Sequence, residues 1–171
     1  MLVLNVIYSL AISLWLGGAA LFTFVLTPKL FAALSRDMAG MIVGLLFPGY
    51  FRWGLACGAV ALLCRLAGRG RFALPSMAIL AVMLILTATQ AFVIEPRAVA
   101  IKEQIASFDT TPKDHPARVQ FRKLHGLSMA ANLAVIAGGV VLLVLSSLPG
   151  AGTTPASGTL PQAAQILDRR P

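Results

Sequence analysis

Long stretches without a charged residue constrain this chain more than any other feature of its sequence. Residues 2–26, 72–94 and 133–148 contain no Asp, Glu, Lys or Arg, and about 20 consecutive apolar residues suffice for a helix to cross the hydrocarbon core of a bilayer. The whole chain is 58% hydrophobic and 12% charged, whereas soluble domains average about 45–50% and about 25%. The sequence therefore predicts an all-α, polytopic membrane protein.

Three of the expected membrane spans follow directly from these apolar stretches. We expect the first span at residues 2–26, ended by the Thr-Pro pair at 27–28, because the residue before a proline is disfavoured in a helix. The third span is expected at 72–94, ended in the same way by the Glu-Pro pair at 95–96. The fourth is expected at 118–147 and begins outside the hydrocarbon core.

The second span is less regular, because Arg52 interrupts its apolar residues. We expect a short helix at 37–47, a break at Pro48, and the span itself at 48–66, since proline is well tolerated in the first turn of a helix. In this interpretation Arg52 lies about one turn inside the membrane. Arg65 is then expected to extend its charged end to the opposite boundary.

Two polar regions complete the expected organisation. Residues 99–108 have apolar side chains at helical spacing and predict a short amphipathic surface helix before span four. Residues 149–171 are rich in Gly, Pro, Thr and Ala and predict a disordered tail. We therefore expect one domain at 1–148, a four-transmembrane-helix bundle with short interfacial helices, followed by the tail.

The distribution of positive charge argues against binding to nucleic acid. The chain carries a net charge of +8, but its basic residues lie between apolar runs, where membrane-flanking charges belong. Nucleic acid is therefore not an expected partner.

The two cysteines are not expected to pair. Cys57 and Cys64 lie on one helix face, too far apart for a disulfide. No P-loop, dinucleotide-binding fingerprint or zinc-ligand spacing is present, and the uncharged N-terminus predicts a retained first span, not a cleaved signal peptide.

Small residues recur four positions apart within the expected spans. Gly54 and Gly58 form such a pair in span two, and small residues let helices approach closely in lipid. Trp15, in the middle of span one, is therefore expected in the packed core. The bilayer surrounds the bundle, and the small-residue faces suit a second copy of the chain or another membrane protein.

Polar side chains at membrane depth gather at one end of the expected bundle. Four spans of alternating direction bring the ends of spans one and three to the same side as the starts of spans two and four. His125, Ser128 and Asn132 share one face of span four, and Thr27 and Tyr50 lie on the same side. The candidate polar pocket consists of Arg52, Gln90, Glu95, His125, Ser128 and Asn132.

Three interpretations of this pocket are open. Its groups either join the helices by hydrogen bonds, with Glu95 pairing Arg52 or Arg97, or bind a small molecule, haem, quinone or metal, or relay protons through His125 and Glu95. His125 is the natural metal or haem ligand, but metal sites usually need several ligands. We expect a non-enzymatic protein that binds, transports or scaffolds a small molecule, with no catalytic residues. The alternative is a haem- or quinone-binding redox subunit or enzyme.

The distribution of basic residues bears on sidedness. More Lys and Arg lie in the half that holds the loops after spans one and three, which favours both termini on the outer side. The arginine-rich turn at 68–71 argues for the opposite orientation.

Four segments together resemble the transmembrane protein 205-like family. They are LWLGG at 14–18, the Phe- and Pro-containing segment 22–31, the segment 39–48, and FRKLHGLSMAAN at 121–132. The resemblance covers about residues 5–147 and implies a small four-helix membrane protein. We expect this chain to be a multi-pass protein of the cell (inner) membrane. Bacterial members are classed as a domain of unknown function, and eukaryotic relatives are associated with drug export or resistance. No catalytic set is implied. A likeness to copper-resistance D-type proteins lies in architecture only.

Overall fold

Helices account for nearly all of the residues that the computed structural model describes, which are 2–68 and 72–148. The described part contains no strand, so the predicted all-α class is confirmed. In chain order the elements are α1 (Leu2–Ala20), the π-helix η1 (Leu21–Leu26), α2 (Thr27–Ala33), α3 (Arg36–Ala67), α4 (Ala73–Thr89), the π-helix η2 (Gln90–Ile94), α5 (Glu95–Lys102) and α6 (Pro116–Ser147).

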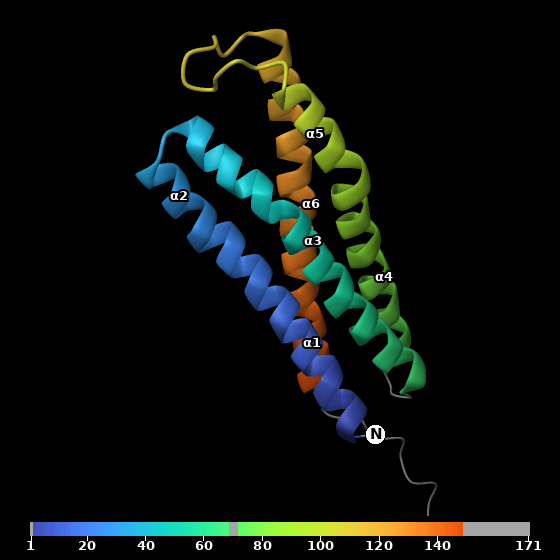
Figure 1. The fold of residues 1–171 in the computed structure, drawn as a ribbon. Coiled ribbons are helices and arrows are strands. Elements are labelled where there is room, and N and C mark those ends of the chain that lie inside the picture. Colours follow the sequence, from blue (N-terminus) through green and yellow to red (C-terminus); the bar gives the residue numbers. More distant parts are fainter. Residues whose placement is uncertain (1, 69–71, 149–171) are drawn as a thin grey trace, which may run out of the picture.

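Consecutive elements join into four long helices that reverse direction at each connection (Figure 1). Leu2–Ala33, Arg36–Ala67, Ala73–Lys102 and Pro116–Ser147 are each long and apolar enough to cross a membrane. Helix α3 packs against α1 and α4, and α6 packs against the same two helices. Within the described residues α1 and α4 are therefore diagonal neighbours, as are α3 and α6. The chain is a multi-pass membrane protein with four spans.

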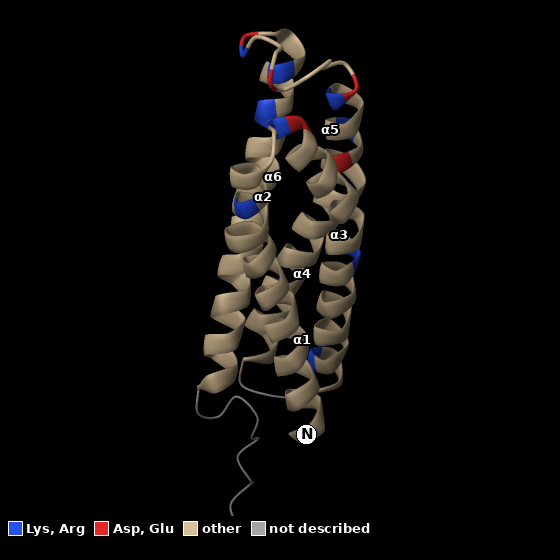
Figure 2. Ribbon diagram, turned by 60° about the vertical axis from the view of Figure 1, so that its left-hand side comes forward, with Lys and Arg blue, Asp and Glu red and all other residues tan. Residues whose placement is uncertain are grey.

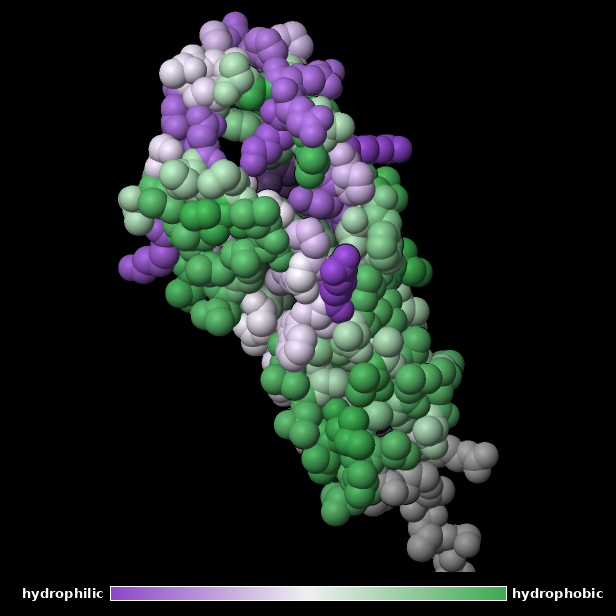
Figure 3. Space-filling view, viewed as in Figure 1, coloured by the Kyte–Doolittle hydropathy of each residue, from purple (hydrophilic) through white to green (hydrophobic). Residues whose placement is uncertain are grey.

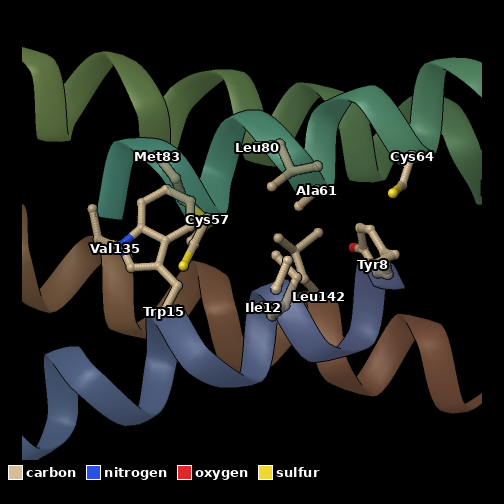
Figure 4. Close-up of a cluster of buried hydrophobic side chains, with 11 residues drawn as sticks. Tyr8, Ile12, Trp15, Cys57, Ala61, Cys64, Leu80, Met83, Val135 and Leu142 are labelled. Atoms are coloured by element: carbon tan, nitrogen blue, oxygen red, sulfur yellow. The ribbon is translucent and has the colours of Figure 1, made fainter. Parts of the chain in front are cut away.

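The centre of the bundle receives one fully buried residue from each long helix: Ile12, Ala61, Leu80 and Leu142. Figure 4 shows these side chains meeting between the helices, with Trp15 beside Cys57 and Met83. Trp15 is only 3% exposed, which confirms its predicted place in the core. Both cysteines are buried, and neither is part of a disulfide within the described residues.

Charged residues gather at one end of the bundle, while the rest of its length is almost wholly hydrophobic (Figures 2 and 3). The loop from 103 to 115 lies at this charged end and links the elements there. Lys102 donates to the Gly40 carbonyl over 3.1 Å, and Asp37 accepts from Ser107 Oγ at 2.5 Å and from the Phe108 amide at 2.6 Å. The loop is therefore attached to the start of α3.

Two predicted helix ends are wrong, because the helices continue through Pro28 and Pro96. A π-turn precedes each proline, and the next helical segment carries the proline in its first turn. The third helix therefore runs to Lys102, and the separate surface helix predicted at 99–108 is absent. The remaining residues of that segment, 103–108, form turns and irregular loop.

The predicted break at Pro48 is also wrong, since α3 is continuous with Pro48 inside it. Aromatic contacts secure the helix on both sides of this proline: Phe47 stacks on Phe51 at 5.5 Å between ring centroids, and Tyr50 stacks on Phe22 of η1 at 4.7 Å. A membrane helix tolerates an internal proline where neighbouring helices support it. The segment 37–47 is thus the first part of span two, not a separate helix.

The end opposite the charged loop contains three buried polar side chains. Arg65 is 6% exposed, and its guanidinium lies 3.9 Å from the centre of the Tyr8 ring, so it does not extend outward to the boundary. Tyr8, Arg65 and Ser76 each stand one turn beyond a fully buried core residue. Tyr8 Oη, Arg65 Nε and Ser76 Oγ are buried without a hydrogen-bond partner among the described residues. The tail predicted at 149–171 lies outside those residues.

Asp37→Ala is expected to release the loop from the start of α3, because the alanine cannot accept from Ser107 and Phe108. Hydrogen–deuterium exchange at the amide of Phe108 and its neighbours should become faster, while exchange in α4 stays unchanged. Asp114→Ala is the matched control, since Asp114 lies in the same loop, is exposed, and its side chain bonds no described group. Equal exchange in the two variants would contradict the anchoring role of Asp37.

Candidate functional site

The two π-turns have the same hydrogen-bond geometry. The Thr27 amide donates to the Phe22 carbonyl, and the Glu95 amide donates to the Gln90 carbonyl, each across five residues instead of four. Proline causes this shift, because its ring clashes with the carbonyl four residues earlier and it has no amide to donate. The wider turn makes room for the ring, and π-turns of this kind often mark functional sites.

Each π-turn leaves one backbone carbonyl without its usual helical donor. The Thr23 carbonyl would accept from the amide four residues later, but that amide bonds Phe22. The next residue along the chain is a proline, which has no amide. The same reasoning applies to the Ala91 carbonyl before Pro96. In a membrane such carbonyls need protein partners, water or a ligand.

A short sequence repeat accompanies the two π-turns. Residues 24–29 read FVLTPK and residues 92–97 read FVIEPR. Both segments follow a long apolar helix, and the two helices run in the same direction on a diagonal of the bundle. The first and second helix pairs therefore carry the same interruption at the same place.

Five polar residues form a hydrogen-bonded layer beside these interruptions, and we call Thr23, Tyr50, Gln90, Ser128 and Asn132 the polar layer. Asn132 donates through Nδ2 to Thr23 Oγ1 at 2.7 Å and accepts from Tyr50 Oη. Ser128, one turn away on α6, donates to Gln90 Oε1 at 3.0 Å. The polar layer therefore joins all four long helices.

Gln90 is the least satisfied member of the polar layer. Its side chain is 2% exposed, and its only hydrogen bond among the described residues is the one with Ser128. An amide offers an oxygen acceptor and a nitrogen donor, so one of the two ends has no partner whichever way the amide is turned. Thr87, one turn earlier, instead bonds the Met83 carbonyl of its own helix at 2.9 Å.

An aromatic wall stands beside the polar layer. Phe22, Phe47, Tyr50 and Phe51 form consecutive ring contacts with centroid distances from 4.7 to 6.5 Å. Phe22 belongs to η1 and the other three to α3. The arrangement can therefore present flat apolar surface on one side and hydrogen-bonding groups on the other.

The structure brings together three of the six candidate pocket residues: Gln90, Ser128 and Asn132. Arg52 is exposed halfway along α3. Glu95 is half-buried, and no hydrogen bond or ion pair joins it to Arg52, to Arg97 or to any other described residue. These two residues therefore lie outside the polar layer.

His125 is also separate from the polar layer. Its imidazole is exposed and stacks on Phe121 one turn away, at 6.1 Å between ring centroids. No group of three His, Cys, Asp or Glu side chains within the described residues could hold a metal ion. Although His125 shares a helix face with Ser128 and Asn132, it lies nearer the charged end.

The sequence does not single out Thr23, and it places Tyr50 only at the polar end of the bundle. The signal for Thr23 was available in the FVLTPK and FVIEPR segments, because a repeated proline motif inside apolar helices marks corresponding interruptions. The partner of each side chain depends on the rotation of its helix, which the π-turns change.

Most of this chain is similar to known proteins. A family model described as "Domain of unknown function (DUF4149)" matches residues 10–107, which include Thr23, Tyr50 and Gln90 but not α6. A protein of Aquifex aeolicus (strain VF5), described as uncharacterized, is 32% identical over 127 residues, covering 73% of this chain and 83% of that protein. No solved structure matches the chain.

Proposed function

This chain belongs to the family described as a domain of unknown function (DUF4149), and we propose that it is a non-enzymatic membrane protein that binds and moves a small molecule at the polar layer. The observation that carries the proposal is the pair of proline-linked π-turns, which leave backbone carbonyls without their helical donors in the same part of the bundle as the partly unpaired Gln90. Four helices joined only to hold one another would not need these interruptions.

The chemistry of the polar layer indicates the class of ligand. The carbonyls of Thr23 and Ala91 accept hydrogen bonds, and Gln90 has a free amide end. The aromatic wall supplies a flat apolar surface. A small amphipathic molecule with an aromatic ring and hydrogen-bonding groups matches both features, since ligand sites are mainly apolar with a few placed polar groups.

The repeated interruption supports movement of the ligand in addition to binding. Membrane transporters are often built from two related halves, and proline-interrupted helices at corresponding positions of the halves point to the substrate site. Here the first half would be α1 to α3 and the second α4 to α6, with parallel orientation. The family resemblance to transmembrane protein 205-like proteins, some associated with drug export, agrees with this proposal.

The location and assembly of the protein are further parts of the proposal. We place it in the cell (inner) membrane, with 1–148 as its transmembrane domain and 149–171 as a separate tail. A Cβ atom added at Gly17, Gly44 or Gly126 would meet nothing within 4 Å. These open positions support association with a second copy or another membrane protein.

A quinone is the second candidate ligand, and the aromatic wall beside Tyr50 and Asn132 is the observation that favours it. Quinone carbonyls accept hydrogen bonds, which the free amide of Gln90 can donate. Haem has less support, because the exposed His125 lies apart from the polar layer. A visible absorption spectrum of the purified protein should therefore show no Soret band.

Gln90→Leu is expected to weaken binding of an amphipathic aromatic probe about tenfold, the loss of roughly one hydrogen bond to a buried site. The probes are ethidium, which offers amino donors, and a short-chain benzoquinone, which offers acceptors. Equilibrium dialysis against protein in lipid nanodiscs measures both affinities. Thr87→Val is the matched control, because Thr87 is buried one turn earlier and bonds its own helix.

His125→Gln separates this proposal from the metal, haem and proton-relay interpretations. Glutamine is a poor metal ligand and does not titrate near neutral pH, and His125 is exposed. Probe binding should therefore equal that of the parent. Affinity that falls in His125→Gln but not in Gln90→Leu would move the site away from the polar layer and contradict the proposal.

A further inference from the structure

A groove on the outside of the bundle, between α5 and α6, is separate from the polar layer. It is a cavity of about 430 Å³ lined by Arg97, Ala100, Ile101, Gln120, Lys123 and Leu124, and we call it the basic groove. Lys102 reaches from α5 to the Gly40 carbonyl of α3, and by helical spacing Arg97 and Ala100 lie on the opposite face of α5. The basic groove therefore opens away from the bundle.

Two positive charges line this groove without a negative partner. Arg97 from α5 and Lys123 from α6 are both exposed. Neither makes a hydrogen bond or ion pair with another described residue, and no lining residue is acidic. Like charges that line one cavity repel each other, and an anion bound between them would remove that repulsion.

The groove has an apolar floor that continues toward the hydrophobic length of the bundle. Ala100, Ile101 and Leu124 supply the floor beside the two cations. One turn further from the charged end stand Val93 on η2 and Leu127 on α6, and Leu127 is 58% exposed. A ligand with a charged head and a hydrocarbon chain would therefore meet matching surface along its length.

We infer that the basic groove binds an anionic phospholipid, with its phosphate held by Arg97 and Lys123 and an acyl chain lying over Val93 and Leu127. Guanidinium and ammonium groups are the usual partners of phosphate, and basic pockets between membrane helices bind anionic headgroups. The position of the groove, where the charged end meets the apolar length, is where the phosphate of a lipid lies. The free phosphate ion would use only the two cations and none of the apolar floor.

The test uses the full chain purified in a neutral detergent, with phosphatidylglycerol and phosphatidylcholine of identical acyl chains as probes. Native mass spectrometry measures the affinity for each lipid. The parent should prefer phosphatidylglycerol. Arg97→Gln combined with Lys123→Gln should weaken phosphatidylglycerol binding roughly 30-fold, which is the product of about five- to sixfold for each cation lost.

Two further variants distinguish the groove from general surface charge. Lys29→Gln combined with Arg36→Gln removes two exposed cations from the same end but outside the groove, and it should bind phosphatidylglycerol like the parent. Ala100→Phe keeps every charge and fills the floor, so it should lose phosphatidylglycerol binding.

Three outcomes would overturn the inference. The first is equal affinity of the parent for the two lipids, and the second is equal loss in the groove variant and the Lys29/Arg36 variant. The third is displacement of the lipid by inorganic phosphate at comparable concentration, which would assign the cations to a free anion. Because Gln90 and the aromatic wall are unaltered in all of these variants, ethidium and quinone binding reports separately on the polar layer.

Discussion

Gly58→Leu is expected to prevent the four helices from closing around Trp15. A Cβ atom at this position would lie 2.6 Å from Leu84 Cδ2 and 2.6 Å from Trp15 Cζ3, which is closer than side-chain atoms approach. Both neighbours are held by the core, so α3 would have to move away from α1 and α4. Overpacking of a core costs about 1–3 kcal/mol and sometimes more, and four added carbon atoms at the centre of the bundle should reach at least the upper part of that range.

The matched control for this change is Val60→Leu, two residues further along α3. Val60 is 42% exposed and faces outward, so a larger side chain there meets only lipid or detergent. Thermal unfolding in detergent, followed by tryptophan fluorescence, should show a clearly lower midpoint for Gly58→Leu and little change for Val60→Leu. Equal midpoints would show that the close contact between Trp15 and α3 at Gly58 does not contribute to the stability of the fold.

Asn132→Leu is expected to have the second-largest effect, because it removes two hydrogen bonds of the polar layer in one change. Tyr50 Oη loses its acceptor and Thr23 Oγ1 loses its donor, while leucine keeps the number and branching of the side-chain heavy atoms. Hydrogen bonds between membrane helices contribute about 0.6 kcal/mol on average and up to about 1.7. A loss of about 1–3 kcal/mol in stability is therefore expected, together with loss of probe binding.

A double-mutant cycle with Tyr50→Phe tests this pairing directly. Phenylalanine keeps the ring contact with Phe22 and removes only the hydroxyl. Asn132→Leu should cost less in the Tyr50→Phe background than in the parent, because the shared hydrogen bond is already absent. Fully additive losses in thermal stability would show that the Tyr50–Asn132 contact contributes nothing.

His125→Ala provides the contrast on the same helix. Its sequence position suggested that His125 and Asn132 act alike, since both lie on one face of span four. In the structure His125 is exposed and stacks only on Phe121, so His125→Ala should unfold close to the parent. A loss as large as that of Asn132→Leu would place the imidazole inside the polar layer.

The helices continue through Pro28 and Pro96, although the sequence predicts that they end there. Pro28 and Pro96 were expected to end their helices because the preceding residue avoids the α conformation. The structure avoids the clash by shifting one hydrogen bond to the fifth residue and continuing the helix. In lipid a helix end exposes backbone groups with no water to bond, so a π-turn is less costly than a break. Pro48 shows the same preference with neighbouring aromatic rings as its support.

The sequence by itself determined the all-α class, the four spans and the end at which polar residues gather. Each of these depends on sums over many residues: the transfer of apolar runs into lipid and the alternation of span direction. The tertiary structure alone decided that Thr23 and Tyr50 join Asn132, that Gln90 keeps a free amide end, that Arg52 and His125 remain outside, and that Arg65 is buried over Tyr8. Such contacts depend on the rotation of each helix about its axis. The two π-turns and the packing of Trp15 against Gly54 and Gly58 determine that rotation. A single shifted hydrogen bond therefore changes which side chains meet.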